Sequence, residues 1–344
     1  MTDTTTTSPV APTGAASIKY GLLLPHFGEH ADRSKLLDGA VLAESYGFDS
    51  LWVRDHLVFE PHGEMETPDP TFYEALTTLT AVGAVTERIQ LGTGSLIPFR
   101  HPVHTALTLG TIDKLIGEDR LVIGFGAGTF DHEFDVVGMG DANRVDLVRS
   151  NAEILRLLAT QDDVTYKDEY YNFTNVTVAP KPASPIPFWY CGATPKSARL
   201  AAEYADGWMP GRTTLRTIEQ RAATMRQITD ENGRPMPTIG VIPPTSIAPM
   251  HDAAFEGLNI DGLIAWANKR GKWWAKPESG EFKTAADIEG SLIAGTPDEV
   301  VQQVHRFAEV GVRHLVFDFR LTYERWFASM ELLGREVLPA LRSA

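Results

Sequence analysis

The chain has 344 residues, 43% of them hydrophobic, and a net charge of −14 from 45 acidic and 31 basic residues. This composition allows a large buried core, either as one large barrel or as two average domains. The acidic balance disfavours nucleic acid and anionic membranes as partners, because both require a concentrated basic surface.

The N-terminal segment and the cysteine content exclude further classes of protein. Residues 1–17 are small and polar and lack the apolar segment of a secretion signal, so we expect a disordered tail before a single domain over residues 18–344. No apolar run reaches the length of a membrane span, which is about 18 residues. The lone cysteine, Cys191, excludes an internal disulfide and a cysteine-based zinc site. We expect a cytoplasmic protein.

Strand-like and helix-like segments alternate along the whole chain. Short apolar runs alternate with longer segments whose apolar residues recur at helical spacing. The predicted strands are 18–24, 48–53, 88–95, 120–126, 186–192, 206–210, 237–249 and 313–319. The predicted helices are 33–47, 71–86, 102–117, 144–159, 195–205, 215–233, 297–311 and 323–341.

This alternation predicts an α/β fold with parallel strand pairing. Eight strand–helix units match a closed (β/α)8 TIM barrel. The alternative is an open Rossmann-type sheet with a cap domain. In a barrel the chemistry takes place at the carboxyl ends of the strands, so candidate residues are expected there.

Two segments interrupt the alternation. Residues 164–178 alternate aromatic and polar residues, which is typical of a β-hairpin. Residues 250–290 follow the seventh strand and contain Trp266, Trp273 and Trp274. Long loops are usually functional or disordered, and the tryptophans argue against disorder. We expect this insertion to form a lid over the barrel mouth, or alternatively a subunit contact.

Glycine-rich loops follow the third, fourth and fifth predicted strands. Glycine lets a backbone approach a ligand closely and adopt positive φ. Repetition at successive strand ends indicates loops around a large, flat, phosphate-bearing cofactor, although any single loop would be an ordinary tight turn. The candidate cofactor-binding residues are Gly94, Ser95, Leu96, Ala127, Gly128, Thr129, Cys191, Gly192, Ala193 and Thr194.

The last of these loops leads into a predicted helix. Thr194 is expected to be its N-cap, and Pro195 occupies the first helical position. A helix N-terminus can hold phosphate through its amides and dipole, and Lys196 would add charge. An ordinary helix cap explains the same residues equally well.

Asp55 and His56 follow the second predicted strand. A carboxylate beside an imidazole can set its tautomer and pKa, as general acid–base catalysis requires. Both are candidate catalytic residues, for proton handling or for contact with a cofactor ring. Adjacent residues need not face each other, so a structural role is the alternative. The residues expected to shape an apolar substrate pocket are His26, Phe27, Trp52 and Trp189.

No metal site is expected. The histidines contain no H-E-x-x-H pattern. His101 and His104 have a spacing that can bind metal, but surface or pocket-lining positions are favoured. A G-x-S-x-G elbow and a Walker loop are also absent from the sequence, so nothing indicates a serine hydrolase or a P-loop nucleotidase.

Six segments together resemble the luciferase-like flavin-dependent oxidoreductases, the superfamily of bacterial luciferase and of the coenzyme F-420-dependent reductases and dehydrogenases. They are "GLLLPHFG", "LAESYGFDSLWVRDHL", "ERIQLGTGSLIPFRHPV", "DRLVIGFGAGTFDHEFDVVG", "CGATPKSARLAAEYADGW" and "AGTPDEVVQQVHRFAEVGVRHLVF". The resemblance covers most of residues 18–320 in order. It implies a TIM barrel and an oxidoreductase with a flavin-type cofactor.

Within this superfamily, the resemblance favours coenzyme F-420 over FMN. Members that use F-420 often carry Asp-His after the second strand, as Asp55-His56 do, whereas FMN members more often carry Glu-His-His. The resemblance also implies a non-prolyl cis peptide near Gly94–Ser95–Leu96. Thr129 stands roughly where F-420-dependent sugar-phosphate dehydrogenases carry a catalytic glutamate, which puts that chemistry in doubt. Glu133 is close by, but on the following segment.

We therefore expect F-420-dependent hydride transfer to or from a small organic substrate. One alternative is an FMN-dependent monooxygenase that receives reduced flavin from a partner reductase. Another is a non-catalytic flavin-binding protein. The resemblance also implies a homodimer, with the predicted helix 102–117 and the helix before it as a candidate contact.

Overall fold

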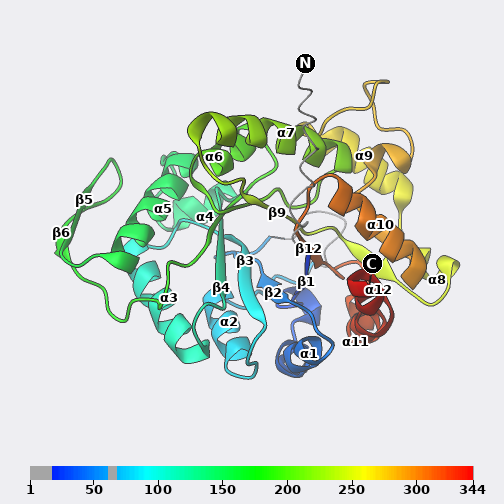
Figure 1. Ribbon diagram of the computed structural model, residues 1–344, viewed down its shortest axis with the longest axis horizontal. Coiled ribbons are helices and arrows are strands. Elements are labelled where there is room, and N and C mark those ends of the chain that lie inside the picture. The colour runs from blue at the N-terminus through cyan, green and yellow to red at the C-terminus, as the bar shows by residue number, and fades with distance from the viewer. Residues whose placement is uncertain (1–17, 61–67, 344) are drawn as a thin grey trace, which may run out of the picture.

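Eight parallel strands form the centre of the molecule in the computed structural model, which describes residues 18–60 and 68–343. They are β1 (Lys19–Leu23), β2 (Ser50–Val53), β3 (Gln90–Leu96), β4 (Leu121–Gly126), β7 (Phe188–Cys191), β8 (Gly207–Met209), β9 (Thr238–Val241) and β12 (His314–Phe317). They close in the order β1-β12-β9-β8-β7-β4-β3-β2 (Figure 1). This confirms the (β/α)8 barrel and rules out the open sheet.

Helices surround the barrel, as alternation with parallel strands requires. They are α1 (Arg33–Ser45), α2 (Ala75–Gly83), α3 (Pro102–Ile116), α4 (Asp131–Val136), α5 (Arg144–Thr160), α6 (Pro195–Tyr204), α7 (Leu215–Asn232), α8 (His251–Phe255), α9 (Ile260–Arg270), α10 (Pro297–Glu309), α11 (Trp326–Leu332) and α12 (Leu338–Ser343). Among the described residues, no helix is long and apolar enough to cross a membrane.

Local sequence explains where these helices begin. The carboxylate of Asp32 accepts hydrogen bonds from the backbone amides of Ser34 and Lys35 at the start of α1. At the start of α10, Thr296 and Glu299 form a reciprocal capping box. Each cap satisfies backbone amides that lack a partner within the helix.

Large aromatic side chains fill the barrel interior. Trp52 and Trp189 pack together with ring centroids 5.4 Å apart, and His314 meets both rings edge-on at 5.2 and 5.4 Å. Glycines make room for them: a Cβ at Gly92 would lie 2.6 Å from Trp52, and one at Gly240 would lie 2.4 Å from Trp189. The barrel interior is therefore a packed core.

Two predicted elements differ from the structure, and one helix in the structure was not predicted. The predicted strand 237–249 is divided into β9 and β10 (Thr245–Ile247), because the Pro243–Pro244 pair cannot donate hydrogen bonds to a continuing strand. The predicted helix 323–341 is instead a 3-10 turn, α11, a π-helical turn over Leu333–Val337 and α12. Helix α4, with six residues, was not predicted and follows the β4 loop.

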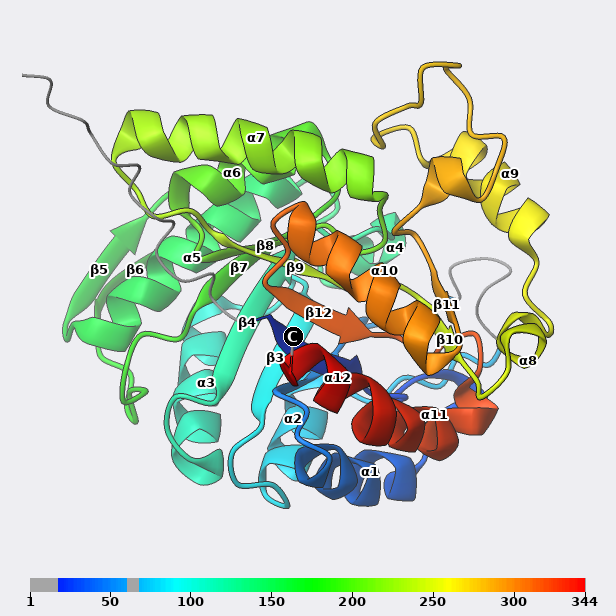
Figure 2. The same cartoon turned by 45° about the vertical axis from the view of Figure 1, so that its right-hand side comes forward.

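Two segments lie outside the regular strand–helix alternation. The predicted hairpin is confirmed as the antiparallel pair β5 (Val164–Lys167) and β6 (Asn172–Val176). It projects on one side of the molecule, whereas α8 and α9 lie on the other (Figures 1 and 2). Between β9 and β12, β10 pairs in parallel with β11 (Ile293–Gly295). The predicted disordered tail, residues 1–17, lies outside the described residues.

The segment 250–290 has a small core of its own. Its buried side chains are Leu263, Ala267, Trp274, Phe282 and Ile288. Phe282 is tied to α9, because the amide and carbonyl of Phe282 hydrogen-bond the side chain of Asn268 at 3.1 and 2.8 Å. The segment is therefore a packed substructure that contains Trp274 in its core and Trp266 against it, whereas Trp273 is exposed.

Candidate functional site

A cavity of about 850 Å³ opens at the carboxyl ends of the barrel strands. Residues that follow seven of the eight barrel strands line it, so it lies where TIM barrels carry their active sites. The predicted site residues among its lining are Asp55, His56, Gly94, Ser95, Ala127, Gly128, Thr129, Cys191, Gly192, Ala193 and Thr194. The fold thus brings together residues that are up to 139 positions apart in the chain, from Asp55 to Thr194.

Three predicted residues lie in the barrel interior instead of in the cavity lining. Leu96, Trp52 and Trp189 are buried in the main hydrophobic core. Trp52 lies beneath the cavity, since its Cε3 atom is 3.6 Å from the position of a Cβ at Gly94. These side chains support the floor of the cavity.

His26 and Phe27 also lie outside the lining and support the loop after β2. The backbone amide of Arg54 donates to Nε2 of His26 at 2.9 Å, and Nδ1 of His26 lies 3.1 Å from the carbonyl oxygen of Tyr73. The guanidinium of Arg54 stacks on Phe27 at 4.6 Å. Burial lowers the pKa of His26 to about 3, so this histidine stays neutral.

The glycine-rich loops after β3 and β4 pack directly against each other. The Gly94–Ser95 peptide bond is cis, at the position that the resemblance indicated. A Cβ at Gly126 would lie 2.3 Å from Oγ of Ser95, so only glycine allows this approach. Gly128 has φ +74°, a left-handed conformation that favours glycine. The two loops therefore form a tightly fitted wall of the cavity.

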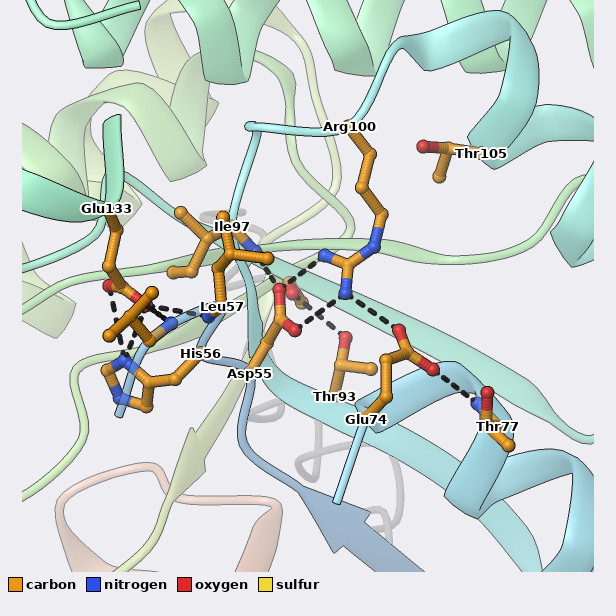
Figure 3. Close-up of polar contacts among 12 residues, drawn as sticks. Asp55, His56, Leu57, Glu74, Thr77, Thr93, Ile97, Arg100, Thr105 and Glu133 are labelled. Atoms are coloured by element: carbon orange, nitrogen blue, oxygen red, sulfur yellow. Dashed lines mark hydrogen bonds and ion pairs between the residues drawn. The ribbon is translucent and has the colours of Figure 1, made fainter. Parts of the chain in front are cut away.

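Asp55 anchors the β3 loop. Arg100 donates to both carboxylate oxygens of Asp55, at 2.6 and 2.8 Å, and the amide of Ile97 donates at 2.9 Å. Arg100 also donates to Glu74 at 2.7 Å, and Figure 3 shows Arg100 between the two carboxylates. Burial raises the pKa of Asp55, and the Arg100 guanidinium opposes this shift. Because its oxygens are engaged, Asp55 is suited to hold the loop.

His56 turns away from Asp55 toward a different partner, Glu133 (Figure 3). Nδ1 of His56 lies 3.2 and 3.3 Å from the two carboxylate oxygens of Glu133. The same carboxylate accepts from the amides of Leu57 and Val58 at 2.7 and 3.2 Å. Burial opposes its ionisation, but His56 and these amides hold the pKa of Glu133 below its usual value.

This arrangement assigns roles to the two nitrogens of His56. With Nδ1–H donating to the carboxylate of Glu133, Nε2 is the nitrogen that can accept a proton. Nε2 lies 3.4 Å from Nη2 of Arg54, which also lines the cavity. A carboxylate-oriented imidazole of this kind is suited to general acid–base chemistry.

The sequence analysis did not assign a role to Glu133. Glu133 lies in the first turn of α4, and its side chain is fully buried. The available signal was an acidic residue directly after the glycine-rich loop of a barrel strand, which places it near the mouth. The sequence pattern pointed instead to Asp55, the chain neighbour of His56.

The N-terminus of α6 borders the cavity through Ala193, Thr194 and Ser197. Oγ1 of Thr194 accepts from the amide of Ser197 at 3.0 Å, which confirms Thr194 as the N-cap. Helix N-termini favour phosphate groups, so this border can hold the phosphate of a ligand. Lys196, in contrast, is exposed and not part of the lining.

The lining as a whole fits a flavin-type cofactor. Its floor is apolar and its wall glycine-rich, as a flat ring system requires, and the α6 N-terminus provides an anion site. The apolar floor includes Leu23, Ile97, Met209 and Ile242. Across residues 18–60 and 68–343, no three metal-binding side chains converge.

Comparison with known proteins identifies the family of this chain. A family model described as luciferase-like monooxygenase matches residues 18–314, most of the chain. The chain belongs to the luciferase-like monooxygenase family. The matched residues span all eight strands from β1 into the start of β12.

Curated relatives of this luciferase-like chain include dehydrogenases. An F-420-dependent glucose-6-phosphate dehydrogenase from Nakamurella multipartita is 28% identical over 337 residues, which cover 90% of this chain and 93% of the relative. The similarity therefore extends over the whole barrel.

Two solved structures with the same fold contain different kinds of cofactor. An F-420-dependent secondary alcohol dehydrogenase, in complex with an F-420–acetone adduct, superposes with a TM-score of 0.76 at 21% identity, covering 95% of this chain and 99% of that one. The oxygenating constituent of 3,6-diketocamphane monooxygenase from Pseudomonas putida, in complex with FMN, superposes with a TM-score of 0.74 at 20% identity, covering 94% and 98%.

Proposed function

We propose that this luciferase-like protein is a coenzyme F-420-dependent oxidoreductase that transfers a hydride to or from a small organic substrate. The observation that carries the proposal is the His56–Glu133 pair at a cavity with glycine-rich walls. The F-420-dependent dehydrogenase relative, similar over 90% of this chain, supports the choice of cofactor. When bound, F-420 supplies two-electron hydride transfer.

The chain's own residues bind, orient and move a proton in this scheme. Gly94, Gly126 and Gly192 let the backbone approach the ring, and the α6 N-terminus binds the phosphate. Nε2 of His56 takes the hydroxyl proton when an alcohol is oxidised, and returns it in the reverse direction. The carboxylate of Glu133 stabilises the imidazolium.

Asp55 has a positioning role in this proposal. It fixes the β3 loop through Arg100 and Ile97 and so shapes the ring site. Thr129 offers no carboxylate, and the resemblance places it roughly where sugar-phosphate dehydrogenases of the F-420 branch carry a catalytic glutamate. We therefore do not extend the proposal to glucose 6-phosphate oxidation.

Separate titrations of the purified protein with F-420 and with FMN, followed by absorbance under anaerobic conditions, test the cofactor. We expect F-420 to bind; binding of FMN alone would contradict the proposal and favour a two-component monooxygenase with a partner reductase. A screen of small alcohols and ketones with the bound cofactor then tests turnover.

Two histidine variants separate catalysis from simple cofactor binding. We expect His56→Ala to retain F-420 but to lose most of the turnover. The matched control, His305→Ala, removes an exposed histidine on α10 and should retain both. Unchanged turnover in His56→Ala would identify a cofactor-binding protein without this chemistry. The proposal also includes a homodimer, which rests on the resemblance, and a cytoplasmic location.

A further inference from the structure

A second cavity lies between the segment 250–290 and α10, and we call it the α9–α10 cavity. Its volume is about 240 Å³, and its walls come from the start of α7, from α8, α9, β11 and α10, and from the turn before β11. Figure 2 shows α8, α9 and α10 on the same side of the molecule. Among the described residues, none that lines this cavity also lines the cavity at the barrel mouth, so the two spaces are separate.

The lining of the α9–α10 cavity is almost entirely apolar. Its large apolar side chains are those of Leu215, Phe255, Ile260, Ile288, Leu292 and Phe307. They come from both sides of the cavity, from the segment 250–290 and from the helices α7 and α10. A ligand inside would therefore be surrounded by hydrocarbon.

The polar side chains of the lining already have partners. Among the described lining residues, only Glu289 and Gln303 have polar side chains. Oε1 of Gln303 accepts from the amide of Ala294 at 3.2 Å, and its Nε2 donates to the carbonyl oxygen of Ala294 at 2.8 Å. The carboxylate of Glu289 pairs with Arg306 at 3.0 Å. The lining thus favours a ligand that needs no hydrogen bond.

Contacts around the cavity fix its walls relative to one another. The amide of Leu215 donates to the carbonyl oxygen of Glu289 at 2.8 Å, which joins α7 to the turn before β11. A Cβ at Gly290 would lie 2.8 Å from the backbone nitrogen of Leu215, so these segments are already in close contact. The Glu289–Arg306 pair joins the same turn to α10. Collapse of the space would require these contacts to change.

The size and chemistry of the space favour an apolar occupant over water. Protein interiors rarely contain voids larger than a water molecule, because an empty void loses the dispersion contacts of the atoms that line it. A buried water needs about two to four polar partners, which the bonded side chains of this lining do not provide. An engineered apolar cavity of about 150 Å³ is large enough to bind benzene.

We propose that the α9–α10 cavity binds a small uncharged apolar molecule, with one aromatic ring or an aliphatic group of similar size. Ala285 and Glu289 are the exposed members of the lining, so the ligand enters at the turn before β11. The inference goes beyond the proposed function and does not depend on it, because it involves no residue of the barrel mouth.

Isothermal titration with toluene, with and without saturating F-420, tests the site. We expect one toluene per chain in both titrations, because the cofactor occupies the other cavity. The absence of saturable binding would overturn the inference. Binding only in the protein without F-420 would place toluene at the barrel mouth and would overturn it as well.

A variant that fills the cavity locates the bound toluene. Ala294 is buried in β11 and lines the cavity, so Ala294→Leu adds side-chain atoms to the space. We expect toluene to bind at least about 10-fold more weakly. The matched control is Ala159→Leu, at a separate apolar cavity between α3 and α5. Equal loss of affinity in the control would overturn the assignment to the α9–α10 cavity.

A second variant protects the test against misfolding. Ala285 lines the cavity but is exposed, so Ala285→Leu narrows the entrance and leaves the packed core intact. We expect toluene binding to weaken about 3- to 10-fold. If Ala294→Leu does not fold, Ala285→Leu decides alone, and unchanged affinity in the folded variants would overturn the proposed site.

Benzoate tests the chemical class of the ligand. It has a ring of the same size as toluene, but its carboxylate would lose water inside the cavity without a hydrogen-bond partner. We expect benzoate to bind at least about 10-fold more weakly than toluene. Equal affinities for the two molecules would contradict an apolar site.

Discussion

Nδ1 of His56 lies 3.2 Å from Oε2 of Glu133, whose side chain is completely shielded from solvent. The contact joins the loop after β2 to the first turn of α4, and the amides of Leu57 and Val58 complete the carboxylate's hydrogen bonds. A carboxylate that is buried and fully bonded cannot swing away, so it fixes both the ring orientation and the tautomer of His56.

Replacement of this carboxylate should impair proton transfer more than cofactor binding. We expect Glu133→Gln to lower kcat about 10- to 100-fold, because general acid–base catalysis is worth about 10²–10⁴. F-420 affinity should stay within a few-fold of wild type, since the glycine-rich wall of the cavity is unchanged. The measurements are kcat for F-420 reduction and titration with F-420.

Glu60→Gln is the control for Glu133→Gln. Glu60 is exposed, and its Oε1 lies 3.6 Å from Nδ1 of His132. Like Glu133, His132 belongs to α4. Equal losses of kcat and of F-420 affinity in Glu133→Gln would mean that the carboxylate acts only by holding α4 in place.

Asp55→Asn tests whether Asp55 positions the β3 loop or takes part in the chemistry. The substitution leaves Arg100 with one anionic partner, Glu74, and we expect a loss of about 2–3 kcal/mol in the free energy of unfolding. F-420 affinity should fall as the loop loosens, while kcat at saturating cofactor stays within a few-fold of wild type. Urea unfolding and cofactor titration provide the two measurements.

Glu74→Gln is the comparison for Asp55→Asn, because it removes the more exposed contact of Arg100. We expect it to cost about 1 kcal/mol or less. If Asp55→Asn keeps its stability and cofactor affinity but loses turnover, Asp55 would have to be assigned to proton transfer.

Two buried histidines should make the fold sensitive to mild acid. Burial lowers the pKa of both His26 and His314 from 6.5 to about 3. Between these values the unfolded chain binds protons that the folded chain does not, so stability is complete above pH 6.5 and falls as pH decreases. Each histidine should contribute a slope of about 1.4 kcal/mol per pH unit.

Urea unfolding between pH 7 and pH 5 measures this slope. We expect His314→Asn to be less stable at pH 7, since it loses the 2.6 Å contact with Ser50, but to show a shallower decline toward pH 5. The exposed-site control, His305→Asn, should retain the full slope. An identical decline in His314→Asn and wild type would refute the prediction.

Gly126→Ala tests the close approach of the β3 and β4 loops. The new Cβ would lie 2.3 Å from Oγ of Ser95 and 3.1 Å from its Cβ, so the cavity wall must shift. We expect about 1–3 kcal/mol of destabilisation and a roughly tenfold loss of F-420 affinity. Thermal unfolding and cofactor titration give the two values.

Gly138→Ala provides a control for a glycine substitution away from the cavity. Gly138 has φ +74° with open space around its Cβ position, and it lies outside the cavity lining. It should lose about 1 kcal/mol of stability without a change in F-420 affinity. Equal affinities in wild type and Gly126→Ala would show that the wall does not shape the cofactor site.

Sequence alone predicted most of the architecture. Strand–helix alternation gave eight barrel units, and the glycine-rich strand ends predicted which loops line the cavity, because both signals are local and periodic. The prediction failed where a local rule was interrupted: Pro243–Pro244 ended β9 early, and short α4 has too few residues to show a helical period.

The partners of individual side chains depended on the fold. Asp55 and His56 are neighbours in the chain, yet Asp55 binds Arg100 and His56 binds Glu133, which is 77 positions away. Trp52 and Trp189 belong to strands that predict burial, but only barrel closure decides that they lie below the cavity instead of in its wall. The local sequence pattern determines which segments become strands and helices. Strand order and loop packing decide which side chains meet, because they bring together residues that are remote in sequence.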